Sequence, residues 1–356
     1  MRDILFRTIE PMMFRGASEF SPTSRGPQTG AWSRPLPPPS TIAGALATLI
    51  LQHENRSLVG GKPSAWYEEV TDVLGGKGST MLRGPYLING EGGTYVQYKE
   101  GLLLLNELKK GLTKGDLLKA AKDLDKAKNK FELGHVDLIG IKLSDENKAT
   151  ETGLVYSARM VDYGKIGGRK NISCSIMIEI LKASDSLEKA LLTPKIIRLG
   201  GEGRLVEVIA EELQPVSEFV RAEGCRTREL RLYVATPMLF EASPCLFSKE
   251  GVEVEPGTVF LSSSLNWKVS AYLNDVGFKA TFIRVAGSLR MLGGFSVAKA
   301  ARKPMYAALH PGSVIEITRE LPFSKEDCYK IYSEGLGLFR DLGYGTVIPI
   351  PIVNHA

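Results

Sequence analysis

The segment Thr8-Ile-Glu-Pro-Met-Met-Phe14 returns in changed form as Val234-Ala-Thr-Pro-Met-Leu-Phe240. Each copy ends an apolar run, Ile4–Ile9 in the first case and Leu230–Ala235 in the second. Both runs are rich in residues that favour β-strands, and the proline in each copy cannot donate to a sheet ladder. We therefore expect two strands that end in the same way, and two copies of one domain rather than one large fold.

The ends of the two halves also share an order of elements. In the first half, a helical stretch at Ser186–Leu192 precedes the glycine turn within Leu199–Leu205 and a strand-like run. In the second half, Lys325–Ser333 precedes the glycine-rich loop Gly335–Gly345 and another strand-like run. A half that opens with a strand and closes with a helix, a loop and a strand fits a ferredoxin-like, or RRM-like, βαββαβ unit.

The predicted fold class is therefore α+β, with two tandem ferredoxin-like domains. We place the first at 1–225, with long insertions, and the second at 226–356, with the C-terminal glycine-rich loop; the junction is the polar stretch near Glu218–Arg228. Within the insertions, Thr113–Lys130 has the spacing of a lysine-rich amphipathic helix with a solvated face. His135–Leu143 is β-like, and the polar segment that follows has the character of an insertion.

The composition is that of an ordinary globular protein. The chain has 356 residues, of which 43% are hydrophobic and 24% charged. A net charge of +5 permits a polyanionic partner but does not require one. Between Asp275 and Glu316 there is no acidic residue, although six basic ones occur: Lys279, Arg284, Arg290, Lys299, Arg302 and Lys303. This acid-free segment indicates either a nearby anionic ligand or a basic face solvated by water.

Four cysteines, at positions 174, 225, 245 and 328, lack the spacing of a zinc site. We interpret them as reduced thiols of a cytoplasmic protein. The charges of Arg2, Asp3 and Arg7 interrupt any secretory signal, and the longest apolar stretch is well below the roughly 20 residues of a membrane span. No phosphate-binding Walker loop or carboxylate cluster occurs, so we expect neither a cofactor nor a metal.

A candidate anion site lies at the start of a predicted helix. The loop Arg15–Pro39 is rich in Gly, Pro and Ser, carries Arg34 and leads to Ser40, which we expect to cap a helix over Thr41–Gln52. The N–H groups at a helix start bind phosphates. Gly44 inside this helix predicts a close backbone contact.

Two glycine turns, each with an arginine, complete the candidate site. The first contains Arg198, Gly200, Gly201, Gly203 and Arg204, and the second contains Gly337, Arg340, Gly343, Tyr344 and Gly345. Glycine lets backbone amides approach a ligand, and arginine binds phosphate and stacks on bases. With Lys299, Arg302 and Lys303, these residues favour an extended anionic chain, and single-stranded RNA fits best. Tight packing of the backbone is the alternative explanation for the glycines.

Three stretches carry a resemblance to a known family. They are Arg34-Pro-Leu-Pro-Pro-Pro-Ser-Thr-Ile-Ala-Gly-Ala-Leu46, Ile197-Arg-Leu-Gly-Gly-Glu-Gly-Arg204, and the segment with Gly293-Gly-Phe-Ser296, Lys303-Pro304 and Pro311-Gly-Ser-Val314. From about residue 4 to 352 the chain resembles the third subunits of the Cmr complex, the type III-B CRISPR effector, within the RAMP superfamily. Phe295 and Ser296 depart from the tryptophan and aspartate of the family's pattern.

The resemblance implies a non-catalytic RNA-binding subunit of a ribonucleoprotein that acts in antiviral defence. Such a subunit holds the repeat-derived 5′ tag of the CRISPR RNA, and its other partners are the large polymerase-like subunit and the backbone RAMP subunits; no membrane is involved. The resemblance supports the residues named above at the helix start and in the glycine turns, while Arg340 and Tyr344 are added from their chemistry. It also implies a projecting thumb hairpin, for which Ser144–Lys170 is the candidate.

The alternative is a metal-independent RAMP endoribonuclease that processes CRISPR repeat RNA. Such cleavage needs a general base, and the histidines are His53, His135, His310 and His355. Only His310 lies in the acid-free segment, just before a Pro-Gly turn. A turn histidine bonded to the backbone is the simpler interpretation, so we expect a protein that binds and does not catalyse.

Overall fold

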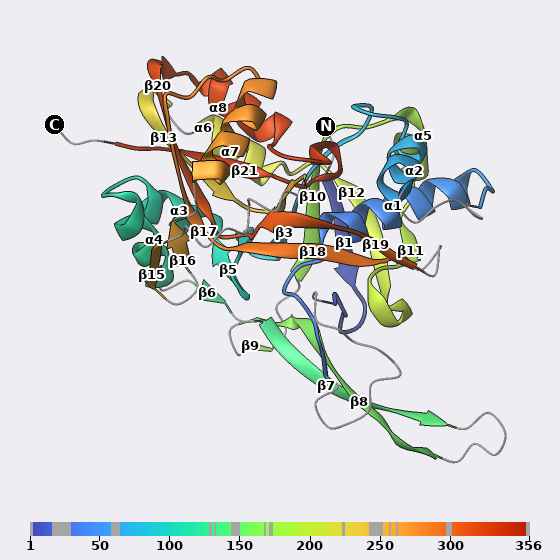
Figure 1. Ribbon diagram of the computed structural model, residues 1–356. Helices are drawn as coiled ribbons and strands as arrows, with labels where there is room; N and C mark the ends of the chain where they lie inside the picture. Colours follow the sequence, from blue (N-terminus) through green and yellow to red (C-terminus); the bar gives the residue numbers. More distant parts are fainter. Residues whose placement is uncertain are drawn as a thin grey trace.

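In the computed structural model, residues 3–15, 30–57, 65–127, 130–131, 133–143, 150–166, 169–170, 174–222, 225–241, 252–255, 258–260, 263–296 and 301–353 are described. The fold comprises helices and four β-sheets (Figure 1). Among the described strands, all pairs are antiparallel apart from β2 with β8. The α+β class predicted from the sequence is confirmed.

The largest sheet is built around the N-terminal strand. It has eight strands in the order β11 (Lys195–Arg198), β12 (Leu205–Glu211), β1 (Asp3–Thr8), β10 (Cys174–Lys182), β3 (Met81–Asn89), β4 (Thr94–Tyr98), β5 (Gly101–Leu104) and β6 (Lys130–Phe131). Successive residues of β1 face opposite sides of the sheet. Ile4 and Phe6 therefore enter the core shared with helix α1, whereas Leu5 enters the core shared with the C-terminal half.

The second sheet is built around the strand that contains the second copy of the repeated segment. Its six strands are ordered β15 (Val252–Glu255), β16 (Thr258–Phe260), β17 (Phe282–Gly287), β20 (Val314–Phe323), β13 (Thr227–Val234) and β21 (Val347–Pro351). Each of the two larger sheets contains four strands that, numbered along the chain, lie in the order 4-1-3-2: β12-β1-β10-β3 in one and β21-β13-β20-β17 in the other. Strands β1 and β13 occupy equivalent places and both end shortly before their prolines, as predicted.

Two smaller sheets are formed by long hairpins. One consists of β14 (Met238–Phe240), β19 (Ala301–Leu309) and β18 (Leu289–Ser296), and lies across the middle of Figure 1. The other consists of β2 (Gly30–Trp32), β8 (Thr150–Ile166) and β7 (Leu133–Leu143), with β9 (Arg169–Lys170) beside β8. The β7–β8 hairpin projects from the body of the molecule (Figure 1).

The helices fall into three groups. Helices α1 (Pro39–His53), α2 (Trp66–Val73) and α5 (Asp185–Ala190) pack together beside the first sheet. Helices α6 (Pro215–Ala222), α7 (Ser263–Asp275) and α8 (Lys325–Glu334) accompany the second sheet. Helix α3 (Leu105–Leu112) contacts strands of both sheets, and α4 (Leu117–Asp125) contacts β17 and β20 of the second. None of the described helices combines the length and the apolar character needed to cross a membrane.

Several boundaries differ from the sequence predictions. Helix α1 begins at Pro39, and Pro38 precedes it without a side-chain cap, so Ser40 lies in the first turn and does not cap the helix. The helix predicted over 113–130 is shorter, because Asp116 accepts a hydrogen bond from the Lys119 amide and starts α4 only at Leu117. The polar stretch predicted as a domain junction contains the end of helix α6, whose Val220 is fully buried.

The cysteines require a correction. Cys225 and Cys328 form a disulfide between residues 103 positions apart, so they are not the reduced thiols that we expected. The bond joins the segment after α6 to helix α8, and both residues are fully buried. Cys174 is a buried thiol, and Cys245 lies outside the described residues. Because the loop that this bond closes is long, it removes much conformational freedom from the unfolded chain.

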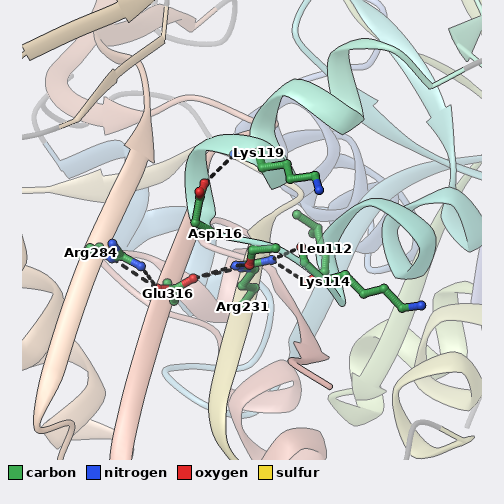
Figure 2. Close-up of polar contacts among 8 residues, drawn as sticks. Leu112, Lys114, Asp116, Lys119, Arg231, Arg284 and Glu316 are labelled. Atoms are coloured by element: carbon green, nitrogen blue, oxygen red, sulfur yellow. Dashed lines mark hydrogen bonds and ion pairs between the residues drawn. The ribbon is translucent and has the colours of Figure 1, made fainter. Parts of the chain in front are cut away.

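A buried ion pair joins the helices α3 and α4 to the second sheet (Figure 2). The Arg231 side chain of β13 is 1% exposed, and its Nε lies 3.0 Å from a carboxylate oxygen of Glu316 in β20. Its Nη1 donates to the carbonyl oxygens of Leu112 and Lys114, both at 3.0 Å. Arg284 of β17 binds the other carboxylate oxygen. Arg231 thereby satisfies backbone acceptors at the end of α3 that would otherwise be buried without a partner.

A second buried network lies where α6 begins. The Glu179 carboxylate of β10 accepts hydrogen bonds from the Val216 amide at 2.7 Å and from the hydroxyls of Ser217 and Tyr332 at 2.6 Å. Asp3 is the partner of Glu179 across the β1–β10 pair and is also fully buried. Its Oδ2 accepts from the Leu213 amide at 3.2 Å, whereas no partner is found among the described residues for its Oδ1. Burial raises the pKa of Asp3 to about 7.

Candidate nucleic-acid interface

We predicted that the start of helix α1 is open to a ligand, but in the structure it is covered. Pro39 and Ser40 are buried. Burial raises the pKa of Tyr344, and a hydrogen bond between Ser40 and the Tyr344 hydroxyl acts in the opposite direction with a smaller effect. Gly343 lies against Pro39 in the same contact. Further along α1, Thr41 and Gly44 are half-buried, and Gly44 lies near the Trp66 side chain, not near another backbone segment. The C-terminal glycine-rich loop therefore packs against the start of α1, where we predicted a phosphate site.

The first glycine turn packs against the chain that follows β1. Gly200 has a φ of +76°, and a Cβ there would lie 2.6 Å from the Met13 carbonyl oxygen. The Gly201 amide donates to that same oxygen at 2.8 Å. Arg204 forms an ion pair with Glu10, whose carboxylate also accepts from the Leu205 amide at 3.0 Å. The Gly201 amide and Nη1 of Arg204 are thus engaged within the protein, whereas Nε of Arg204 has no partner among the described residues, and Arg198 and Gly203 are exposed.

The second glycine turn also packs on backbone. A Cβ at Gly337 would lie 2.7 Å from the Leu239 carbonyl oxygen, and one at Gly345 would overlap the Leu336 carbonyl oxygen. Gly343 and Gly345 are buried, and Tyr344 is 1% exposed. Protein atoms surround these three residues in the structure, and their direct contact with RNA stays a prediction. Gly337 and Arg340 are half-buried.

The cations of the acid-free segment lie in different environments. Lys303 is 8% exposed, its Nζ lies 3.6 Å from the centroid of the Trp66 ring, and burial lowers its pKa to about 7. Arg284 pairs with Glu316, as described above. Lys279 and Arg302 are exposed, and Lys299 lies outside the described residues. Across the described residues, the segment therefore does not present one continuous basic face.

The structure does bring Arg34 together with two residues of this segment. A pocket lies between strand β2, the β4–β5 turn and the β18–β19 hairpin, and its walls include Trp32, Arg34, Glu100, Arg290 and His310. Burial lowers the pKa of the Arg34 guanidinium. The Arg290 side chain is 61% exposed, and its Nη1 lies 3.5 Å from Oε1 of Glu100 at the mouth of the pocket. Two guanidiniums thus meet beside one carboxylate.

His310 contributes an uncharged imidazole ring to this pocket. Burial lowers its pKa, and the positive charges of Arg290 and Arg34 act in the same direction. Its Nδ1 lies 3.0 Å from the Pro311 carbonyl oxygen. Because a carbonyl only accepts, Nδ1 carries the proton in the neutral ring and Nε2 remains an acceptor. The backbone bond expected for a turn histidine is confirmed.

A row of three side chains crosses the neighbouring small sheet. Arg159 of β8 is paired in register with Trp32 of β2 on one side and with Asp137 of β7 on the other. The guanidinium lies 4.5 Å from the centroid of the Trp32 ring, and Asp137 accepts two hydrogen bonds from it, at 2.8 and 3.2 Å. Trp32 and Arg159 were not predicted as site residues. The signal for Trp32 was an aromatic residue two positions before Arg34 in a Gly- and Pro-rich loop.

Comparison with known proteins supports the resemblance noted in the sequence. The profile of the CRISPR-associated protein (Cas_Cmr3) family matches residues 118–351, more than half of the chain. The chain belongs to the Cmr3 family. This membership confirms the family predicted from the sequence motifs.

Relatives of this Cmr3-family chain match over nearly its whole length. The CRISPR system CMR subunit Cmr3 of Saccharolobus solfataricus is 25% identical over 355 residues, which cover 98% of this chain and 96% of the relative. A chain in a cryo-EM structure of the type III-B Cmr-beta complex bound to cognate target RNA has a TM-score of 0.56 at 20% identity, with 97% of this chain and 96% of that chain covered. A second such structure, with target RNA and AMPPnP, also has a TM-score of 0.56 and 20% identity, over 88% of this chain and 86% of the other. The likeness to these solved chains establishes a shared fold.

Proposed function

We propose that this chain is an RNA-binding subunit of a cytoplasmic type III-B Cmr complex in CRISPR defence. In this proposal it holds the 5′ tag of the CRISPR RNA and docks against the large polymerase-like subunit and the backbone RAMP subunits. Membership of the Cmr3 family and the near full-length match to Cmr3 of Saccharolobus solfataricus support the assignment to the complex. The observation that carries the RNA-binding role is the pocket in which Arg34, Arg290 and His310 converge.

The chemistry of this pocket suits the sugar–phosphate strand of RNA. Arg34 and Arg290 supply donors for phosphate oxygens, and low hydration around a buried guanidinium strengthens such contacts. Gln97 and the neutral His310 add groups that can bond to ribose hydroxyls or base edges. Glu100 partly neutralises Arg290 in the unbound protein, and a bound phosphate would replace Glu100 as the partner of that guanidinium. The residues of the two glycine turns do not line this pocket.

We further propose that the chain comprises two ferredoxin-like domains, 1–225 and 226–356. The shared 4-1-3-2 strand order of the two larger sheets supports this division. A helix follows the first strand of each set (α1 after β1, and α7 after β13), and a helix precedes the last (α5 before β12, and α8 before β21). The repeated segment and the shared order of elements point to the same unit.

The projecting β7–β8 hairpin is our proposal for the thumb. It begins at Leu133, before the predicted Ser144, and β8 continues to Ile166. The segment 144–149, between the two strands, lies outside the described residues. The exposed apolar side chains of Leu138 and Ile139 on β7, with exposed fractions of 39% and 75%, support a role in contact with a partner molecule.

We propose that the chain acts by binding and does not cleave RNA. The neutral Nε2 of His310 is the feature that favours the alternative endoribonuclease, because it can accept a proton beside two cations. Incubation of the purified chain with repeat RNA and EDTA separates the two proposals. Intact RNA is the expected result, and cleavage that is lost in His310→Ala would favour the nuclease.

The binding role is tested by equilibrium titration of tag RNA with Arg290→Ala. Arg290 is mostly exposed, so its loss leaves the fold intact, and we expect binding to weaken by about 1–3 kcal/mol. Arg56→Ala is the matched control, because Arg56 is equally exposed and paired with Glu54 at the end of α1. Equal affinities of wild type and Arg290→Ala would remove the pocket from the RNA site.

A further inference from the structure

Trp32 presents one open face of its ring at the mouth of the pocket. The residue is 60% exposed, although large aromatic side chains are usually buried in folded proteins. One face of the ring is covered by the Arg159 guanidinium at 4.5 Å from the centroid. The exposed area must therefore come from the opposite face and the ring edges.

The covering guanidinium is fixed in place. Asp137 binds Arg159 through Nε and Nη2 with both carboxylate oxygens, in the two-point geometry that sets the orientation of the guanidinium plane. The three residues lie in one row of a sheet, so their backbones set the spacing. The ring of Trp32 is thus supported on one side by a rigid, charged plane, and a second flat group can stack on the other side at little cost in side-chain entropy.

The surroundings of Trp32 select the kind of flat group. Trp32 lines the same pocket as Arg34 and Arg290, whose positive charges favour an anion within one nucleotide of the ring. Nucleobases stack on exposed aromatic rings irrespective of sequence, and arginine next to such a ring strengthens the contact. An apolar protein segment would gain nothing from the two guanidiniums of the pocket, whereas a nucleotide uses both the ring and the charges.

We propose that Trp32 is the stacking platform for one unpaired base of single-stranded RNA whose phosphate lies in the pocket of Arg34 and Arg290. The proposal rests on the RNA-binding function proposed above and adds to it a residue and a mode of contact. The base, the Trp32 ring and the Arg159 guanidinium form a three-layer stack, and Asp137 holds the lowest layer. This contact requires a base at that position but does not distinguish one base from another.

A double-mutant experiment with altered RNA tests this stack. Tag RNAs that each lack the base at one position are titrated against the full-length chain, its Trp32→Ala and Trp32→Phe variants, and Trp267→Ala. Trp267 is the matched control, because it is 76% exposed and belongs to α7. For wild type we expect one abasic position to weaken binding about tenfold. Loss of the base at the same position should not change the affinity of Trp32→Ala. It should still weaken binding by Trp32→Phe and by Trp267→Ala.

The outcomes separate the stacking role of Trp32 from the RNA-binding function on which it rests. If Arg290→Ala weakens binding but every abasic position has the same effect in wild type and Trp32→Ala, the platform is overturned and the RNA-binding function stands. If wild type binds no tag RNA, both proposals fail. If adenosine monophosphate alone saturates the pocket and displaces the RNA without any abasic effect, the pocket serves a free nucleotide and the platform for RNA is again overturned.

Discussion

The Nε of Arg83 donates a hydrogen bond to the Tyr332 carbonyl oxygen at 2.8 Å, joining strand β3 to the last turn of helix α8. Arg83 is fully buried, and its other nitrogens donate to the carbonyl oxygens of Ser333 and, at 2.7 Å, Arg340. A helix end leaves its last carbonyl groups without partners inside the helix. Here the guanidinium of Arg83, from a distant strand, donates hydrogen bonds to these carbonyl groups. Its positive charge also interacts favourably with the negative end of the helix.

We predict that Arg83→Met lowers the free energy of unfolding by about 3 kcal/mol or more, because several buried carbonyl groups lose their donor at once. Denaturant titration followed by circular dichroism measures the change. Arg56→Met provides the comparison, since Arg56 forms an exposed pair with Glu54 and should alter stability by less than about 1 kcal/mol. A similar, small effect of both substitutions would show that the contacts of Arg83 contribute little to stability.

The disulfide between Cys225 and Cys328 leads to a second prediction. Replacement of both cysteines by alanine should lower the free energy of unfolding by about 2–5 kcal/mol, since the unfolded chain regains the freedom of a 103-residue loop. Reductant should lower the Tm of the wild type and leave that of the double variant unchanged. Alkylation of the unfolded, unreduced chain counts its thiols by mass spectrometry, and four labelled cysteines would contradict the bond.

The buried Asp3 carboxyl should make stability depend on pH. It titrates near 3.9 in an unfolded chain and at about 7 in the folded protein, so the folded state binds more protons between these values. The free energy of unfolding should therefore fall as the pH rises from about 4 to 7, by about 1–2 kcal/mol after allowance for residual hydration. Asp3→Asn should remove this fall. Asp72→Asn, at an exposed position of α2, should retain it, and an unchanged profile in Asp3→Asn would contradict the assignment.

Two adjacent cations should contribute differently to RNA binding. Arg302 is exposed, whereas Lys303 is buried against Trp66 and loses its charge near pH 7. At pH 8 we expect Arg302→Gln to reduce the slope of log K against log salt by about 1, as for one lost phosphate contact. Lys303→Met should leave that slope unchanged. A reduced slope in Lys303→Met would place its ammonium group at the RNA and not in the core.

The sequence predicted best those elements whose signals are local. The runs that became β1, β12, β13 and β21 were recognisable from apolar patterning, and their neighbours in the chain marked their ends. Helix α8 begins at Lys325, the residue at which the predicted helical stretch began, and the structure shows a complete capping box there, in which Ser324 and Asp327 exchange hydrogen bonds. Helix α1 was misjudged at its start, because a proline can occupy the first turn as readily as Ser40 can cap it.

The pocket could not be assembled from the sequence. Its walls come from β2, the β4–β5 turn and the β18–β19 hairpin, which are far apart in the chain and meet only through tertiary packing. Arg34 was predicted and His310 was considered, but nothing in the sequence placed them beside Arg290. The backbone contacts of the glycine turns could not be predicted for a related reason. A missing side chain admits either a ligand or another backbone, and at Gly200 and Gly337 the neighbour is a carbonyl group of the protein itself.

The Arg231–Glu316 pair has a consequence for how this protein can be divided. Helix α3 belongs to the first 225 residues, yet the guanidinium that satisfies its terminal carbonyl groups comes from β13 and is neutralised by β20. In an excised N-terminal fragment, the last carbonyl groups of this helix would lack their hydrogen-bond donor. In an excised C-terminal fragment, Arg231 and Glu316 would lose the helix that buries them. Expression of either piece alone should therefore yield aggregation, and co-expression of the two should restore a soluble pair.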